Sequence, residues 1–329
     1  MIEEALNNLV RGSQGELKAF LNECCFQKII DKTGAYLHCY HVALDGNGRP
    51  RVEDFIEFIA TKLVDYSIPR TEFDKAAEYL KKYSSDSELA KLRAKAEALF
   101  TDLWNTGEGG ELLLYILVQE LLQIPQLLCK MPLKTSARMH YHGVDGIHAK
   151  FDSTTGLLAL YWGESKLYKN VDEAIKECFT SLKGYLLDPS GAGGAQERDI
   201  NLVKDNLDLN DEQLENALVD YFDKNHPKYN QVNYRGVCLI GFDSDKYPLK
   251  PNSMTLEDLH KLVSAKVTEW LTSAQKELLA HTPLESFEIH VFMIPFPSVE
   301  DFRQKFLNAL KLTPTSRPSR RKKKTKLSP

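Results

Sequence analysis

The sequence predicts an α/β fold, in which a mixed β-sheet is flanked by helices and preceded by an N-terminal, mainly helical extension. Two runs with strand character, 144–151 and 157–168, enclose a turn cluster at 152–156 and predict a β-hairpin. The preceding segment, 111–123, is apolar nearly all round, as expected of a buried helix. Later in the chain, helical and apolar strand-like runs alternate, which would extend the sheet.

Length and composition are those of an ordinary globular protein. The 329 residues suit one enlarged α/β domain with helical additions, or two average domains. Hydrophobic residues make up 43% and charged residues 27%, no run is long enough to span a membrane, and the first residues are acidic where a secretion signal would be basic. The six cysteines form no Cys-x-x-Cys pair, so neither a zinc knuckle nor a disulfide framework is indicated, and the expected compartment is the reducing cytoplasm.

The N-terminal third contains no recognisable catalytic motif and is expected to be a scaffold. Its first 30 residues predict one or two short helices, and 35–44 predicts a strand ended by a Gly-rich turn. His38 and His41 lie three apart on that strand, hence on opposite faces, so satisfied histidines are favoured over a shared metal. Helical patterns follow at 52–66, 71–84 and 87–104.

After the buried helix, the chain predicts a first core strand at 127–133, the hairpin, and then an amphipathic helix at 171–187. A Gly-rich loop at 188–195 lacks the Gly-Lys-Ser/Thr ending of a phosphate-binding loop and is interpreted as a linker. Further strands are expected at 232–242 and 287–294. Further helices are expected at 196–208, 211–223, 256–279 and 299–310.

Charge is distributed unevenly along the chain. The formal net charge is −4, but residues 317–326 carry seven Lys or Arg and no acid, which leaves 35 basic and 46 acidic residues elsewhere. A DNA-handling protein with such an acidic body must bind through a local basic groove, a basic tail or a partner. Candidate phosphate contacts in the tail are Arg320, Arg321, Lys322, Lys323 and Lys324. The alternative is a disordered solubilising end.

Two carboxylates and a lysine converge on the predicted hairpin. If Asp152 pairs with Gly156, Asp145 lies opposite Gly163, and a slip of one residue places it opposite Glu164. Opposed residues have Cβ atoms about 5 Å apart, where like charges are destabilising. Lys166 is two residues beyond Glu164 and projects from the same face.

A divalent cation would explain this arrangement, because it cancels the repulsion and takes oxygen ligands. The lysine would then orient a water or meet the charge that develops on a phosphate. Asp145, Glu164 and Lys166 are therefore candidates for metal-dependent phosphodiester hydrolysis, with Mg²⁺ or Mn²⁺ as the expected ion. The alternative is a pair of rim carboxylates salt-bridged to Lys166.

Glu111 is the third acidic candidate. It would enter the core at the first turn of the buried helix, where the helix dipole favours a carboxylate, and would bind the metal or align water. The alternative is an ordinary N-terminal helix charge in solvent, and Glu108 and Glu120 are weaker competitors.

Lys134 and His148 are weak candidates for contact with DNA. His140, His142 and His148 match the spacing of no known zinc motif, so a zinc site on them is not favoured.

The order helix with Glu, strand, strand with Asp, strand with Glu-x-Lys, then helix resembles the PD-(D/E)xK nuclease superfamily. That resemblance implies a restriction-endonuclease-like core with Asp145 and Glu164 as metal ligands, Lys166 as the water-positioning lysine and Glu111 as the helical acid. The chain departs from the pattern in having Val144, not Pro, before Asp145. The implied organisation is an N-terminal scaffold or partner-binding region at 1–105, a nuclease core at 106–312 and a disordered basic tail at 313–329.

The sequence around these residues indicates a more specific family. Leu133-Lys-Thr-Ser136, His142-Gly-Val-Asp-Gly-Ile-His148 and Gly163-Glu-Ser-Lys166 resemble the HamA family, the nuclease subunits of the bacterial Hachiman anti-phage system. The resemblance implies a DNA nuclease restrained and activated by HamB, a superfamily 2 helicase-like ATPase. Two alternatives stay open: a catalytically silent nuclease-fold adaptor in a defence complex, and an RNase or structure-specific resolvase. The complete acidic set favours an enzyme, and no aromatic-basic repeat selects RNA.

Overall fold

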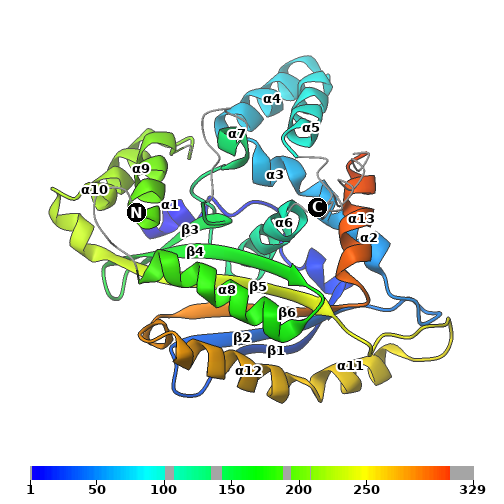
Figure 1. The fold of residues 1–329 in the computed structure, drawn as a ribbon. Helices are drawn as coiled ribbons and strands as arrows, with labels where there is room; N and C mark the ends of the chain where they lie inside the picture. Colours follow the sequence, from blue (N-terminus) through cyan, green and yellow to red (C-terminus); the bar gives the residue numbers. More distant parts are fainter. Residues whose placement is uncertain (1, 101–106, 135–142, 188–193, 208, 312–329) are drawn as a thin grey trace, which may run out of the picture.

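The computed structural model describes residues 2–100, 107–134, 143–187, 194–207 and 209–311. Its centre is one six-stranded sheet with the strand order β1-β2-β6-β5-β4-β3 (Figure 1). The strands are β1 (Leu21–Ile29), β2 (Ala35–Val42), β3 (Gly146–Asp152), β4 (Leu157–Tyr168), β5 (Val232–Asp243) and β6 (Ile289–Phe296). The predicted mixed sheet is confirmed, and so is the predicted hairpin of 144–151 and 157–168, whose first strand is Gly146–Asp152.

The sheet is parallel in its middle and antiparallel at both edges. β2, β6, β5 and β4 run parallel to one another, whereas the edge strands β1 and β3 are antiparallel to β2 and β4. Parallel neighbours need a crossover, and α8 (Val171–Leu186) supplies it between β4 and β5. α11 (Leu256–Ser264) and α12 (Val267–Ala280) lie between β5 and β6 in the chain.

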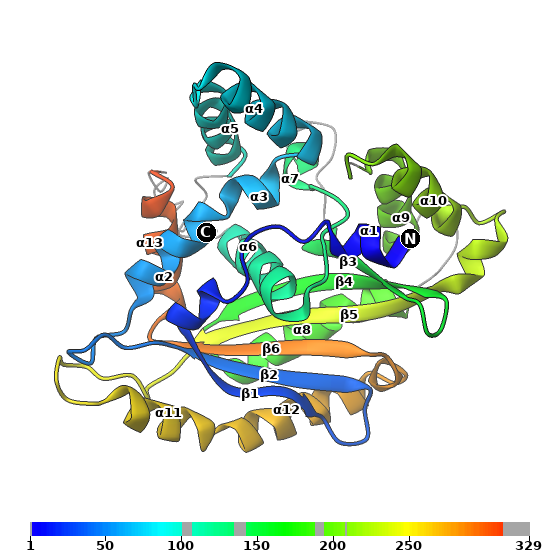
Figure 2. The same cartoon turned by 180° about the vertical axis from the view of Figure 1, so that it is seen from behind.

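Two helical layers cover the sheet. α6 (Glu108–Leu117), α2 (Val52–Thr61) and α13 (Val299–Ala309) lie on one face and α8 and α12 on the other, as the opposite views in Figures 1 and 2 show. Gly163 of β4 marks the close approach of α6, since a Cβ there would lie 3.1 Å from Leu114 Cδ2. Gly236 of β5 marks that of α8, since its Cβ would lie 2.7 Å from Leu182 Cδ2.

The remaining helices lie mostly away from the sheet. They are α1 (Ile2–Asn7), α3 (Leu63–Ser67), α4 (Arg70–Tyr83), α5 (Ser87–Ala98), α7 (Met131–Lys134), α9 (Ala195–Asn206) and α10 (Glu212–Phe222). α6 continues into a π-helical turn at Val118–Leu122. Among the described residues, no helix is both long and apolar enough to cross a bilayer.

Three expected elements are wrong. The first 30 residues are not only helical, because β1 occupies Leu21–Ile29. Its pairing with β2 shifts in register between Glu23 and Cys25 and between Cys25 and Lys28, which disrupts the alternation of side chains between the two faces. The expected strand at 127–133 is reduced to one bridge between Gln126 and His148 followed by α7. Pro132 has no N–H to give to a sheet ladder. The expected long helix at 256–279 is divided into α11 and α12.

The N-terminal region is continuous with the core. β2 pairs in parallel with β6 from the C-terminal part of the chain, with Ala35 opposite Ile289. The first part of the chain therefore supplies two of the six strands of the same sheet.

Candidate active site

The register of the hairpin decides where the predicted acids lie. Gly146 pairs with Gly163, which is the one-residue slip that places Asp145 opposite Glu164. The Asp145 amide donates to the Gly163 carbonyl at 2.8 Å, and along the described chain β3 pairs with β4 no farther than this point. β4 continues to Tyr168, so the two strands form a fork with Asp145 on one arm.

Asp145 is held in the fork by Ser165. The Ser165 amide and its Oγ both donate to Asp145 Oδ2, each at 2.7 Å. Burial, followed by the negative charges of Glu111 and Glu164, raises the pKa of Asp145 to about 8. A carboxyl group that resists ionisation near neutral pH is short of positive charge, which a cation would provide.

Glu164 and Lys166 point together to the α8 side of the sheet, as their spacing predicts. Lys166 Nζ contacts Glu164 Oε1, and Glu164 is only 5% exposed. Burial raises the pKa of Glu164 despite the neighbouring Lys166. Burial acts to lower the pKa of Lys166, but the Glu164 carboxylate outweighs it and the pKa is raised, so the lysine stays a cation.

Glu111 approaches from the other face of the sheet. It lies in the first turn of α6, is 9% exposed, and accepts a hydrogen bond from the Tyr66 hydroxyl at 3.1 Å. α6 sits above the row of β4 that contains Ser165, because a Cβ on Gly110 would be 3.2 Å from Ser165 Oγ. Glu111 and Glu164 thus flank Asp145 from opposite faces, and both raise its pKa.

The donor set fits a hard divalent cation that is incompletely enclosed. Among the residues described, no three carboxylates bring one oxygen each within 4.8 Å of one another, so Asp145, Glu164 and Glu111 do not form a closed cage. Mg²⁺ rarely uses such cages: it keeps several waters and binds through one or two carboxylates together with substrate phosphates. Oxygen donors, excess negative charge and an open arrangement therefore suit Mg²⁺ or Mn²⁺.

A cavity of about 470 Å³ adjoins the fork. It is lined by Lys166, Lys169 and Arg303 together with Ser165 and Glu173, among others. Three cations beside an acidic centre are groups that can bind a phosphate next to it.

Of the weaker candidates, His148 is described in full, and it is enclosed elsewhere in the core. His148 is 1% exposed, and its Nδ1 donates to the Ile124 carbonyl at 3.2 Å. Burial lowers the pKa of His148 to about 4, so a neutral, enclosed ring offers nothing to a phosphate. Lys134 ends α7. His140, His142 and the basic residues from Arg320 to Lys324 lie outside the described residues.

Sequence reasoning missed two residues that hold the acids. Ser165 is the unspecified residue inside Glu-x-Lys, and nothing in that pattern predicts that it would bind Asp145. Tyr66 lies 45 positions from Glu111 in a region without visible chemistry. Only the packing of α3 against α6 brings them together.

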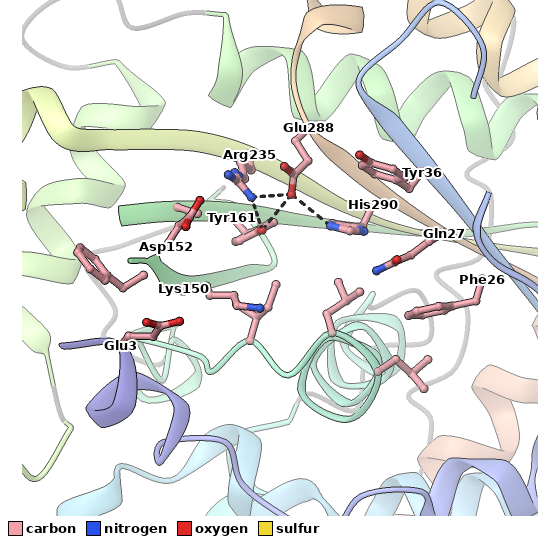
Figure 3. A pocket seen from close by; sticks show the side chains of 15 residues that line it. Glu3, Phe26, Gln27, Tyr36, Lys150, Asp152, Tyr161, Arg235, Glu288 and His290 are labelled. Carbon is pink, nitrogen blue, oxygen red and sulfur yellow. Dashed lines mark hydrogen bonds and ion pairs between the residues drawn. The ribbon is translucent and has the colours of Figure 1, made fainter. Parts of the chain in front are cut away.

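A second cavity, of about 510 Å³, lies on the α6 face of the sheet and is distinct from the fork (Figure 3). Arg235 Nη1 donates to Glu288 Oε1 at 2.7 Å and to the Tyr161 hydroxyl at 2.9 Å, and His290 Nε2 lies 3.4 Å from the same Glu288 oxygen. Glu288 is therefore paired with Arg235 in this cavity, unlike Asp145 in the fork, which lies beside two further acids.

A protein-family model matches most of the chain. The HamA family model matches residues 18–310, which include β1, α6, the fork and α13. The chain belongs to the HamA family. It is therefore a component of the Hachiman anti-phage defence system. No curated protein gave a match to the chain.

Proposed function

We propose that this HamA-family chain is a divalent-metal-dependent deoxyribonuclease that hydrolyses phosphodiester bonds during anti-phage defence. The observation that carries the proposal is the fork, where Asp145 sits between Glu111 and Glu164 with a pKa raised to about 8 and with Lys166 at hand. A structural ion pair would explain Glu164 and Lys166 alone. It would not explain two further acids beside them.

Each residue of the fork has a proposed role in the reaction. Asp145 and Glu164 would hold Mg²⁺ or Mn²⁺, with Glu111 as a third ligand or as the group that aligns water. The ion would supply a Lewis acid for the phosphate and a water of lowered pKa. Ser165 fixes Asp145 by two hydrogen bonds, and Tyr66 fixes Glu111 by one. Lys166 keeps its proton, so it would orient the nucleophile or neutralise the phosphate.

The inferred substrate is DNA, which the protein would contact through the phosphate backbone and not through the base edges. Lys169 and Arg303 line the cavity beside the fork, and such contacts position a duplex without conveying sequence. A nuclease that does not read sequence would endanger its own cell. Control by a HamB-like superfamily 2 helicase, as the family resemblance implies, removes that hazard.

Purified chain, alone and with its helicase partner and ATP, tests the proposal on supercoiled plasmid, linear duplex and single-stranded RNA. We expect DNA to be degraded with Mg²⁺ or Mn²⁺ in the presence of the partner, and EDTA to stop the reaction. DNA left intact under every condition with metal would favour the silent adaptor. Degradation of RNA alone would favour the RNase.

Tyr66→Phe tests how Glu111 is held. The substitution removes only the hydroxyl that donates to Glu111 Oε2 at 3.1 Å, and the ring stays buried. We expect DNA cleavage to fall about tenfold and the unfolding free energy to change by about 1 kcal/mol. Titration of cleavage against Mg²⁺ measures the effect. The matched control is Tyr79→Phe, since Tyr79 lies on α4 and is 36% exposed; equal losses in both variants would contradict the assignment.

A further inference from the structure

A second group of metal-ligating side chains lies at the β1 edge of the sheet, away from the fork. It contains Cys24 of β1, His41 of β2 and His260 of α11, with one ligand atom of each within 4.8 Å of the others. His41 is fully buried, and Cys24 and His260 are half-buried. α11 contacts β1, and Figure 1 shows α11 and α12 beside the β1 edge of the sheet.

The distance between the two imidazoles is that of two ligands on one ion. His41 Nε2 and His260 Nδ1 are 3.4 Å apart. Hydrogen bonds to nitrogen donors are usually about 2.7–3.2 Å long. Two nitrogens bound tetrahedrally at about 2.0–2.1 Å from zinc are separated by about 3.3 Å. The observed separation is at the long end for a hydrogen bond, and it matches that of two nitrogens bound to one zinc.

The outer nitrogens are arranged as in zinc sites. His41 Nδ1 lies 3.0 Å from the Val42 carbonyl, which can only accept, so Nδ1 carries the proton and Nε2 presents its lone pair to the cluster. His260 Nε2 lies 3.4 Å from Ser264 Oγ, on the side away from His41. Metal-bound histidines characteristically give their second N–H to a carbonyl, as His41 does here.

The sulfur has the environment of a ligand. Hydrogen bonds from Cys39 and Ser264 lower the pKa of the Cys24 thiol, although burial opposes the change. Cys39 is itself fully buried, and its own pKa is raised by the contact with Cys24. Cys24 therefore lies within reach of two histidines, and a cysteine binds metal as the thiolate.

We propose that Cys24 Sγ, His41 Nε2 and His260 Nδ1 bind one Zn²⁺, with a water as the fourth ligand. One thiolate and two imidazoles are the donor set that zinc prefers, whereas the oxygen donors of the fork suit Mg²⁺ or Mn²⁺. The ion has a structural consequence, because it joins the irregular edge strand β1 to β2 and to α11, which comes from the far end of the chain. This site is independent of the proposed nuclease chemistry.

The test is Co²⁺ substitution in the full chain stripped of metal by chelation. We expect one Co²⁺ per chain, a thiolate-to-cobalt charge-transfer band, tetrahedral ligand-field bands, and displacement of Co²⁺ by equimolar Zn²⁺. Cys24→Ser should remove the charge-transfer band and His260→Ala should weaken Zn²⁺ binding at least about a hundredfold. His281→Ala is the control: His281 is also half-buried but pairs with Glu277 at 3.0 Å.

Alkylation of the native chain with iodoacetamide gives a second measurement that needs no variant. Bound Zn²⁺ should protect Cys24 from modification, as followed by peptide mass spectrometry, and leave the half-buried Cys129 unchanged. Absence of the charge-transfer band from the unmodified chain, its persistence in Cys24→Ser, or equal alkylation of Cys24 with and without Zn²⁺ would each overturn the proposal. Because these measurements monitor metal and sulfur, they are unaffected by whether the chain cleaves DNA.

Discussion

Glu164→Gln is expected to abolish DNA degradation while the protein stays folded. The amide keeps the shape of the side chain but removes the charge that would hold the metal and that contacts Lys166. Loss of one preorganised catalytic charge costs on the order of a thousandfold in rate. The Lys166 ammonium should not be left buried without a partner in this variant, because its side chain is 21% exposed and can be hydrated. Lys166→Ala should lose DNA cleavage to the same extent for a different reason, because the metal ligands remain but the nucleophile is not positioned.

The two variants can be distinguished by metal binding. Isothermal titration with Mn²⁺ should show weakened binding in Glu164→Gln and binding close to that of the unmodified chain in Lys166→Ala. The matched control is Glu177→Gln, an exposed position of the same α8 layer outside the site. Cleavage at the normal rate by Glu164→Gln with metal supplied would refute the assignment, and so would equal loss in Glu177→Gln.

Local patterns were sufficient to predict the hairpin and the common face of Glu164 and Lys166. Strand alternation and a turn cluster fix side-chain direction over a few residues, and the burial of β4 leaves only two plausible registers. The position of Asp145 could not be fixed in this way, because it depends on where β3 stops pairing. The placement of Glu111 on the opposite face was also beyond local reasoning, since it follows from α6 packing over Gly163.

Contacts between distant segments account for what the sequence did not show. β1 escaped prediction because its register shifts disturb the period of two on which strand recognition depends. His41 and His260 are 219 positions apart, and no spacing rule connects them. The prediction that His38 and His41 face opposite sides of the sheet is confirmed: His38 bonds to His290 at 2.9 Å, beside the second cavity, and His41 meets α11.

Raising the pH should destabilise the metal-free protein, and Asp145 should be the main cause. Its pKa of about 8 in the folded chain lies above the ordinary value of about 3.9, so folding takes up a proton. The stability that this proton brings is fully present below about pH 4 and is lost as the pH rises through about 8. The full shift corresponds to about 6 kcal/mol, but the carboxyl is partly open to solvent, so we expect about 1–3 kcal/mol.

Asp145→Asn should remove that pH dependence, because asparagine cannot ionise and its carbonyl can still accept from Ser165. In EDTA, the variant should match the unmodified chain near about pH 5 and melt a few degrees higher near about pH 8.5. Added Mg²⁺ should raise the melting temperature of the unmodified chain at the higher pH and leave the variant unchanged, since the cation replaces the proton. Differential scanning calorimetry measures both, with Asp31→Asn, an exposed position, as the control.

The decisive comparison is the Mg²⁺ stabilisation at the two pH values. A cation and a proton that compete for Asp145 require the Mg²⁺ effect to grow as the proton leaves. Stabilisation of equal size at about pH 5 and about pH 8.5, or stabilisation retained in Asp145→Asn, would mean that Mg²⁺ binds elsewhere. In that case the raised pKa of Asp145 would reflect burial between Glu111 and Glu164 alone, and the fork would be a strained acidic cluster rather than a metal centre.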